Sequence, residues 1–155
     1  MRTLILTAAL AAATLAAPAL AHMPGGLEVV QAWSRPAAAG MTGAGYMTIR
    51  NRGKQAQTLV KVETPAAKKV EMHRTVTEGG VSRMQPVGQL VIPAGGEAKF
   101  APGGQHLMLV GLARPLKAGQ HVPATLTFAS GVKVKADIVV GTAAPPERPG
   151  SIHNH

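Results

Sequence analysis

The sequence predicts an all-β domain, an antiparallel sandwich or barrel, and three observations favour this class. Short runs rich in β-branched residues recur along the chain, separated by glycine and proline. Apolar periodicity of helical length is absent. The segment Val132-Lys133-Val134-Lys135-Ala136 alternates between apolar and charged residues, as a half-buried strand should. Many short strands at this spacing are typical of sandwiches and barrels.

Ten strands are expected, each an apolar or β-branched run that ends at turn-forming residues. In chain order they are Leu27–Trp33, Ala44–Asn51, Gln57–Thr64, Lys69–Thr75, Gly80–Pro86, Gln89–Ile92, Ala98–Ala101, His106–Gly111, Ala124–Ala129 and Val132–Val140. Glycine and proline place turns at residues 77–80, 93–96, 102–104 and 130–131.

The ends of the chain differ from the strand-rich middle. A positive start, an apolar run over Leu4–Ala16 and small residues ending at Ala21 are typical of a secretory signal peptide, with cleavage expected after Ala21. The apolar run is short for a membrane span and no second one follows. We therefore expect a signal peptide over residues 1–21, one domain over 22–141, and a disordered, proline-rich tail over 142–155.

Composition and charge exclude several functions. The formal net charge is +9, but aromatic residues make up only 3% of the chain, so the stacking surface of a nucleic-acid-binding protein is absent. The chain has no cysteine, which excludes disulfides, thiolate metal sites and a blue-copper centre. The serines lie in no nucleophile-elbow context and carboxylates are few, so we expect no enzyme activity.

Four residues form the candidate metal site: His73, Met84, His106 and Met108. Imidazole and thioether are soft, neutral ligands, which suit Cu(I) better than zinc, calcium or magnesium. His106 and Met108 are two apart on one expected strand, so they share a face while Leu107 and Leu109 point into the core.

The other two candidate ligands lie on an expected hairpin. A tight turn centred on Glu78-Gly79 would place His73 directly opposite Met84. Opposed residues have Cβ atoms about 4.5–5.5 Å apart, a suitable spacing for two ligands of one ion. Met72 would then face away from His73. Spacing alone leaves open whether this hairpin approaches the strand of His106.

The pattern His73-x10-Met84-x21-His106-x-Met108 resembles the signature of the PCuAC family of periplasmic copper chaperones. The sequence segments around the ligands also resemble those of the family: Val-Glu-Met-His at 70–73, Met-Gln-Pro-Val at 84–87 and Pro-Gly-Gly-Gln-His-Leu-Met-Leu at 102–109. The segments 32–36 and 45–51 also look like early strands of the family. The resemblance extends over about Leu27 to Val140.

This resemblance implies a cupredoxin-like, antiparallel Greek-key β-sandwich that binds one Cu(I) through the two histidines and two methionines. It further implies a periplasmic location and delivery of copper, by exchange of ligands, to the binuclear copper centre of cytochrome c oxidase. The partners implied are the oxidase subunit that holds this centre and a thioredoxin-like copper assembly factor. We expect a monomer without a stable membrane span.

Other residues leave alternatives open. Cleavage after Ala21 would expose His22, which could hold Cu(II) as a secondary site or, in a redox enzyme, as part of a copper brace. His153 and His155 are further Cu(II) candidates, although the tail has no methionine. Met41 and Met47 are expected as core or loop residues with auxiliary copper binding as the alternative, and Trp33 and Tyr46 as packing residues. A periplasmic copper storage, buffering or resistance protein without a dedicated acceptor would have the same sequence features.

Overall fold

The computed structural model describes residues 23–147 and contains ten strands after a short 3-10 turn at Pro24–Gly26. The strands are β1 (Leu27–Ser34), β2 (Gly43–Asn51), β3 (Gln57–Glu63), β4 (Ala67–Glu78), β5 (Val81–Pro86), β6 (Leu90–Ile92), β7 (Glu97–Phe100), β8 (Gln105–Leu112), β9 (His121–Phe128) and β10 (Lys133–Val140). All ten expected strands are confirmed, with small differences at their ends. No helix capable of crossing a bilayer occurs within residues 23–147.

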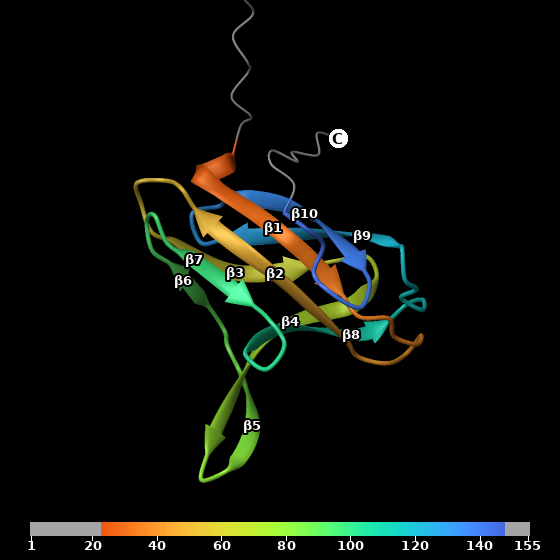
Figure 1. The fold of residues 1–155 in the computed structure, drawn as a ribbon. Helices are drawn as coiled ribbons and strands as arrows, with labels where there is room; N and C mark the ends of the chain where they lie inside the picture. The colour runs from red at the N-terminus through yellow and green to blue at the C-terminus, as the bar shows by residue number, and fades with distance from the viewer. Residues whose placement is uncertain (1–22, 148–155) are drawn as a thin grey trace, which may run out of the picture.

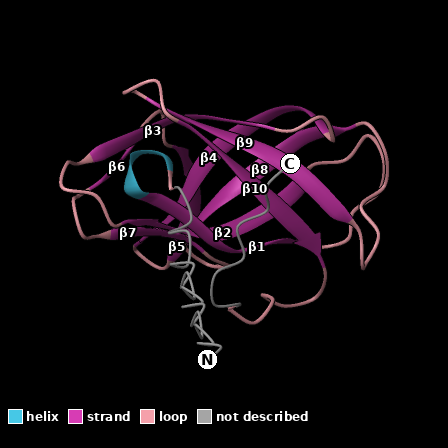
Figure 2. Cartoon of the chain, turned by 90° about the horizontal axis from the view of Figure 1, so that it is seen from above, coloured by secondary structure: helices cyan, strands magenta, loops and turns pink. Residues whose placement is uncertain are grey.

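The strands form one continuous sheet that folds back on itself into two layers (Figures 1 and 2). Their order is β5-β4-β8-β7-β2-β1-β10-β9-β3-β6, with a further pairing between β8 and β2. Strands far apart in the chain therefore lie side by side, such as β4 and β8. All pairings are antiparallel except β1 with β10 and β7 with β8.

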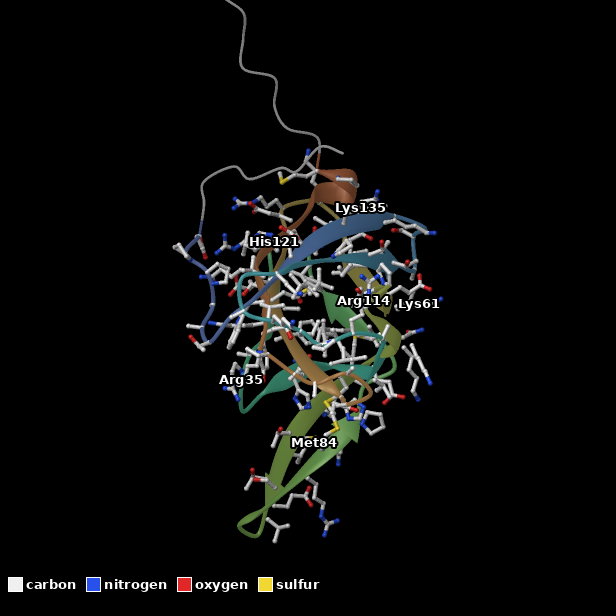
Figure 3. The ribbon with its side chains drawn as sticks, turned by 90° about the vertical axis from the view of Figure 1, so that its right-hand side faces the viewer. Arg35, Lys61, Met84, Arg114, His121 and Lys135 are labelled. Atoms are coloured by element: carbon white, nitrogen blue, oxygen red, sulfur yellow. The ribbon has the colours of Figure 1, made fainter. Side chains whose placement is uncertain are left out.

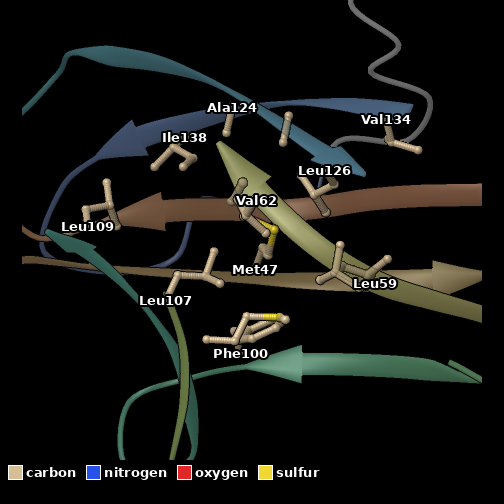
Figure 4. Close-up of a cluster of buried hydrophobic side chains, with 14 of the residues drawn as sticks. Met47, Leu59, Val62, Phe100, Leu107, Leu109, Ala124, Leu126, Val134 and Ile138 are labelled. Carbon is tan, nitrogen blue, oxygen red and sulfur yellow. The ribbon is translucent and has the colours of Figure 1, made fainter. Parts of the chain in front are cut away.

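The core lies between the two layers of the sandwich (Figure 4). Alternate residues of each strand point inward, because successive side chains of a strand face opposite sides of the sheet. Leu107 and Leu109 of β8 are buried, as predicted, beside Met47, Leu59 and Leu126. Met72 of β4 is also buried and faces away from His73, as predicted.

One hairpin leaves the sandwich. The far parts of β4 and β5 extend away from the body as a two-stranded ribbon (Figure 1). Every residue of β5 is exposed, and β5 forms one edge of the sheet. The hairpin is therefore held to the domain through the base of β4, which pairs with β8.

The sequence predicts a disordered tail from Thr142, but residues beyond this position still contact the domain. The Glu147 carboxylate pairs with Arg50 of β2 at 2.7 Å, and the Gln31 side-chain amide donates to the carbonyl of Pro145. These contacts join residues 145 and 147 to the domain, and disorder of the tail over 142–155 stays a prediction. The predicted signal peptide and the histidines at 22, 153 and 155 lie outside the described residues.

Candidate metal centre

The two candidate histidines are direct neighbours across two strands. His73 of β4 is the register partner of His106 of β8. Their ring centroids are 6.0 Å apart with an interplanar angle of 32°. Paired residues of neighbouring strands project from the same face of the sheet. The pairing of β4 with β8 therefore brings the hairpin next to the strand of His106, which the spacing in the sequence left open.

Met108 extends this pair along β8. It lies two residues beyond His106, so it shares that face, as predicted. Its register partners are Glu71 on β4 and Ala44 on β2. Met108 is half-buried, whereas Leu107 and Leu109 on either side of it are fully buried. The core contacts of these two leucines hold the strand in place and thereby fix where His106 and Met108 project.

Met84 is not directly opposite His73, and that predicted pairing was wrong. In the hairpin His73 pairs with Pro86, and Met84 pairs with Thr75. The turn is centred on Gly79-Gly80, whose φ angles of 57° and 78° suit a two-residue turn of type I′. A turn centred on Glu78-Gly79 would force Glu78 into the left-handed region, where a side chain is strained.

The corrected register nevertheless keeps Met84 on the face of His73. The shift is by two residues, and a strand repeats its facing every two residues. Met84 thus becomes a diagonal neighbour of His73, at a typical separation of about 7–8 Å that long side chains can span. All four candidate ligands consequently face the same side of the sheet, over the neighbouring strands β5, β4 and β8.

Exposure increases across the site from β8 to β5. His106 is 6% exposed and the His73 side chain 18%, whereas Met84 is 62% exposed. Figure 3 shows Met84 at the base of the hairpin, where the ribbon leaves the sandwich. A shallow pocket of about 270 Å³ lies between the hairpin and the body of the sandwich. Its lining residues include Met84, His106, Met108, Thr75 and Tyr46. A ligand of an incoming molecule can therefore approach from the Met84 side.

Each histidine has one hydrogen-bonded nitrogen and one buried nitrogen without a partner. His106 Nδ1 is 3.1 Å from the carbonyl oxygen of Gly104, and His73 Nε2 is 3.0 Å from a carboxylate oxygen of Glu71. His106 Nε2 and His73 Nδ1 have no hydrogen-bond partner within the described part of the chain. A buried polar atom without a partner is costly and calls for a physical explanation. Coordination of a metal would provide one.

Glu71 and Lys69 support this arrangement from β4. The Glu71 carboxylate accepts from Lys69 Nζ at 2.5 Å as well as from His73. The hydrogen bond from Lys69, followed by that from His73, holds the pKa of Glu71 below its ordinary value. Sequence reasoning missed Glu71, although its place two residues before His73 on a strand was a signal for a shared face. Tyr46 was expected only as a packing residue, and the place of Tyr46 and Thr75 in the pocket follows from the pairing of the strands.

The donor set remains soft in the folded protein. Within residues 23–147, three or more His, Cys, Asp or Glu side chains nowhere gather in a way that could hold a metal ion. A zinc site made of three or more such side chains is therefore not formed in that part of the chain. Two imidazoles with two thioethers are the alternative that the fold brings together.

The remaining aromatic and methionine candidates lie as packing or loop residues. Trp33 and Tyr46 are buried with ring centroids 4.7 Å apart, and Arg35 lies over the Tyr46 ring. Met47 is 2% exposed within the core, whereas Met41 is 60% exposed in the loop before β2. Trp33, Tyr46 and Met47 therefore pack and Met41 lies in a loop, as expected from the sequence, while auxiliary copper binding by the two methionines stays a prediction.

Known proteins similar to this chain agree with its fold. Residues 27–140 match the family described as LpqE-like, putative lipoprotein LpqE-like. Over 119 residues the chain is 40% identical to the putative lipoprotein Lxx21020 of Leifsonia xyli, covering 74% of this chain and 71% of that protein.

Two solved structures extend the comparison. The solution structure of CuI-DR1885 from Deinococcus radiodurans is 33% identical, with a TM-score of 0.58 over 80% of this chain and 82% of that one. The copper-bound PCuAC domain from PmoF2 is 22% identical, with a TM-score of 0.64 over 80% and 97%. The predicted all-β, cupredoxin-like fold and the resemblance to PCuAC domains are thereby confirmed. The chain belongs to the LpqE-like family, and its fold is similar to that of PCuAC domains.

Proposed function

We propose that this protein is a copper chaperone of the cell envelope that binds one Cu(I) through His73, Met84, His106 and Met108. The observation that carries the proposal is a pair of buried imidazole nitrogens that have no partner among residues 23–147, on the face that also presents both methionines. Neutral nitrogen and thioether donors favour Cu(I) over Cu(II) and over the harder divalent ions. The relatives support this choice, since one is named as a CuI form and another as copper-bound.

The site is also suited to transferring the metal to an acceptor. Met84 is 62% exposed on a projecting hairpin, so a ligand from an acceptor can replace its thioether while the two histidines still hold the ion. Thioethers form no disulfides in an oxidising compartment. We propose the periplasm as that compartment, in keeping with the lipoprotein descriptions of the family and of the Leifsonia relative. The protein would act as a carrier and catalyse no reaction.

The acceptor that we propose is the binuclear copper centre of cytochrome c oxidase, in the subunit that holds it, with a thioredoxin-like copper assembly factor as a further partner. This part of the proposal rests on the family resemblance and on the exchangeable ligands. A storage or buffering protein would hold Cu(I) at the same site without a dedicated acceptor. Transfer of the metal separates the two functions.

The test of binding is a Cu(I) competition titration with a chromophoric chelator, on residues 22–155 and on a variant with all four ligands changed to Ala. We expect one tight equivalent in the first protein and none in the second. A variant with His121→Ala is the control, because His121 is an exposed histidine outside the four-ligand site. Equal binding by all three proteins would contradict the site and direct attention to His22 and the tail histidines.

The test of delivery mixes the Cu(I)-loaded protein with the apo copper domain of the oxidase subunit, with and without the assembly factor. We expect the acceptor to gain copper faster than it does from a Cu(I) complex of the same affinity with a small chelator. Tight binding without transfer in either mixture would favour storage over delivery.

A further inference from the structure

We infer that Glu71 is a positioning residue of the metal site, which makes Nδ1 of His73 and not Nε2 the atom that binds the ion. Glu71 accepts the Nε2 hydrogen of His73 and is itself held by Lys69. The inference deepens the proposed function and rests on it for the identity of the metal.

The hydrogen bonds assign the tautomer of each ring. An ionised carboxylate and a backbone carbonyl can only accept, so the nitrogen facing each of them carries the hydrogen. His73 therefore carries its hydrogen on Nε2, which faces Glu71, and His106 carries its hydrogen on Nδ1, which faces Gly104. The free lone pairs of the neutral rings then lie on His73 Nδ1 and His106 Nε2, the two buried side-chain atoms that lack a partner in the described part of the chain. The two histidines bind through chemically different nitrogens.

Strand geometry explains why Glu71 can reach both neighbours. Lys69, Glu71 and His73 are spaced two apart on β4, so their side chains lie in a row on one face. The Lys69 ammonium is 2.5 Å from one carboxylate oxygen and the His73 ring is 3.0 Å from the other. Both oxygens of Glu71 are therefore engaged, although its register partner is the candidate ligand Met108. Glu71 orients a ligand without offering a hard oxygen to a soft ion.

The two histidines are consequently held in different ways. His106 is anchored by the backbone at Gly104, which no side-chain substitution removes. His73 is anchored by a side chain that is 40% exposed. Removal of Glu71 should affect His73 alone, which gives the experiment an internal control.

The first measurement is the tautomer of each ring in the metal-free protein, obtained from long-range ¹⁵N–¹H correlation spectra. In the wild type we expect the Nε2–H form for His73 and the Nδ1–H form for His106. In Glu71→Ala the His73 signals should move to a mixture of tautomers, while those of His106 stay. Glu71→Gln should retain the Nε2–H form, because the amide oxygen still accepts. An unchanged His73 tautomer in Glu71→Ala would overturn the inference.

The second measurement is Cu(I) affinity by chelator competition on the same variants. Loss of a carboxylate that orients a metal-bound histidine typically costs about 10–100-fold in affinity, so we expect a loss in this range for Glu71→Ala and a smaller one for Glu71→Gln. A wild type that binds no Cu(I) would end the proposed function yet leave the tautomer result standing. Tight binding that Glu71→Ala leaves unchanged would end the positioning role alone.

The matched control is Glu63→Ala on β3. Glu63 pairs with Lys61 at 2.6 Å two residues away, the same arrangement as Glu71 with Lys69 but without a histidine. Lys61 lies on the body of the sandwich, well away from Met84 (Figure 3). Glu63→Ala changes the net charge equally and should alter neither the His73 tautomer nor the affinity. A loss equal to that of Glu71→Ala would attribute both effects to charge and contradict the inference.

Discussion

The two halves of the candidate metal site differ in how firmly the fold holds them. Strand β8 runs through the sandwich, with Leu107 and Leu109 buried on either side of Met108. The hairpin of β4 and β5 leaves the sandwich, and all of β5 is exposed. Each half supplies one histidine and one methionine. From this difference we expect β8 to fix the geometry of the site and the hairpin to allow ligands to exchange.

The largest expected difference between the two halves is in stability. Leu107→Ala removes a side chain that is 0% exposed, and such a cavity typically lowers the free energy of unfolding by about 2–5 kcal/mol. Val81→Ala at the tip of the hairpin changes an exposed side chain, so we expect a change within about 0.5 kcal/mol. Urea unfolding of both variants measures this. Equal losses would mean that the hairpin is part of the cooperative core.

The second prediction compares one ligand from each half. His106→Ala removes an anchored donor and should weaken Cu(I) binding by about 100-fold or more, beyond the range for residues that only orient a ligand. Met84→Ala should weaken equilibrium binding less and speed release of copper to a chelator, because its thioether is exposed and exchanges first. Competition titrations and stopped-flow release measure the two effects. The reverse order of affinities would show that the hairpin, and not β8, dominates the site.

The third prediction uses the register of the hairpin. One glycine inserted between Gly79 and Gly80 shifts β5 by one residue and turns Met84 to the other face of the sheet. We expect the Cu(I) affinity of this variant to equal that of Met84→Ala. Two inserted glycines return Met84 to its face in a longer loop and should restore part of the binding. If both insertions bind as the wild type does, Met84 is not a ligand.

The smallest effect is expected at the tail contact, which belongs to neither half. The Glu147 carboxylate accepts hydrogen bonds from both terminal guanidinium nitrogens of Arg50. These bonds raise the pKa of Arg50 above its ordinary value. Exposed ion pairs contribute little to stability, so Glu147→Ala should lower it only slightly. The loss should disappear at high salt, where such pairs are screened. Cu(I) affinity should stay unchanged; a change would show that the tail acts on the site.

Local pattern accounts for most of what could be predicted from the sequence. The ten strands follow from apolar runs bounded by glycine and proline, and alternation correctly placed Leu107, Leu109 and Met72 in the core. The four candidate ligands follow from donor chemistry, from their spacing and from the family resemblance. The hairpin register was wrong because the two glycines at 79 and 80, and not Glu78, supply the positive φ angles that the turn needs.

The sequence by itself determined which side chains share a face, since facing along a strand repeats every two residues whatever the strand pairs with. Only the tertiary structure decided which faces meet. The pairing of β4 with β8 joins segments more than thirty positions apart and brings His73 opposite His106. The hydrogen-bond partners of the rings, Glu71 and the Gly104 carbonyl, are local, each two residues before its histidine, and the other nitrogen of each ring is buried without a partner among the described residues. Such long-range pairing depends on how the whole core packs, which no local pattern contains.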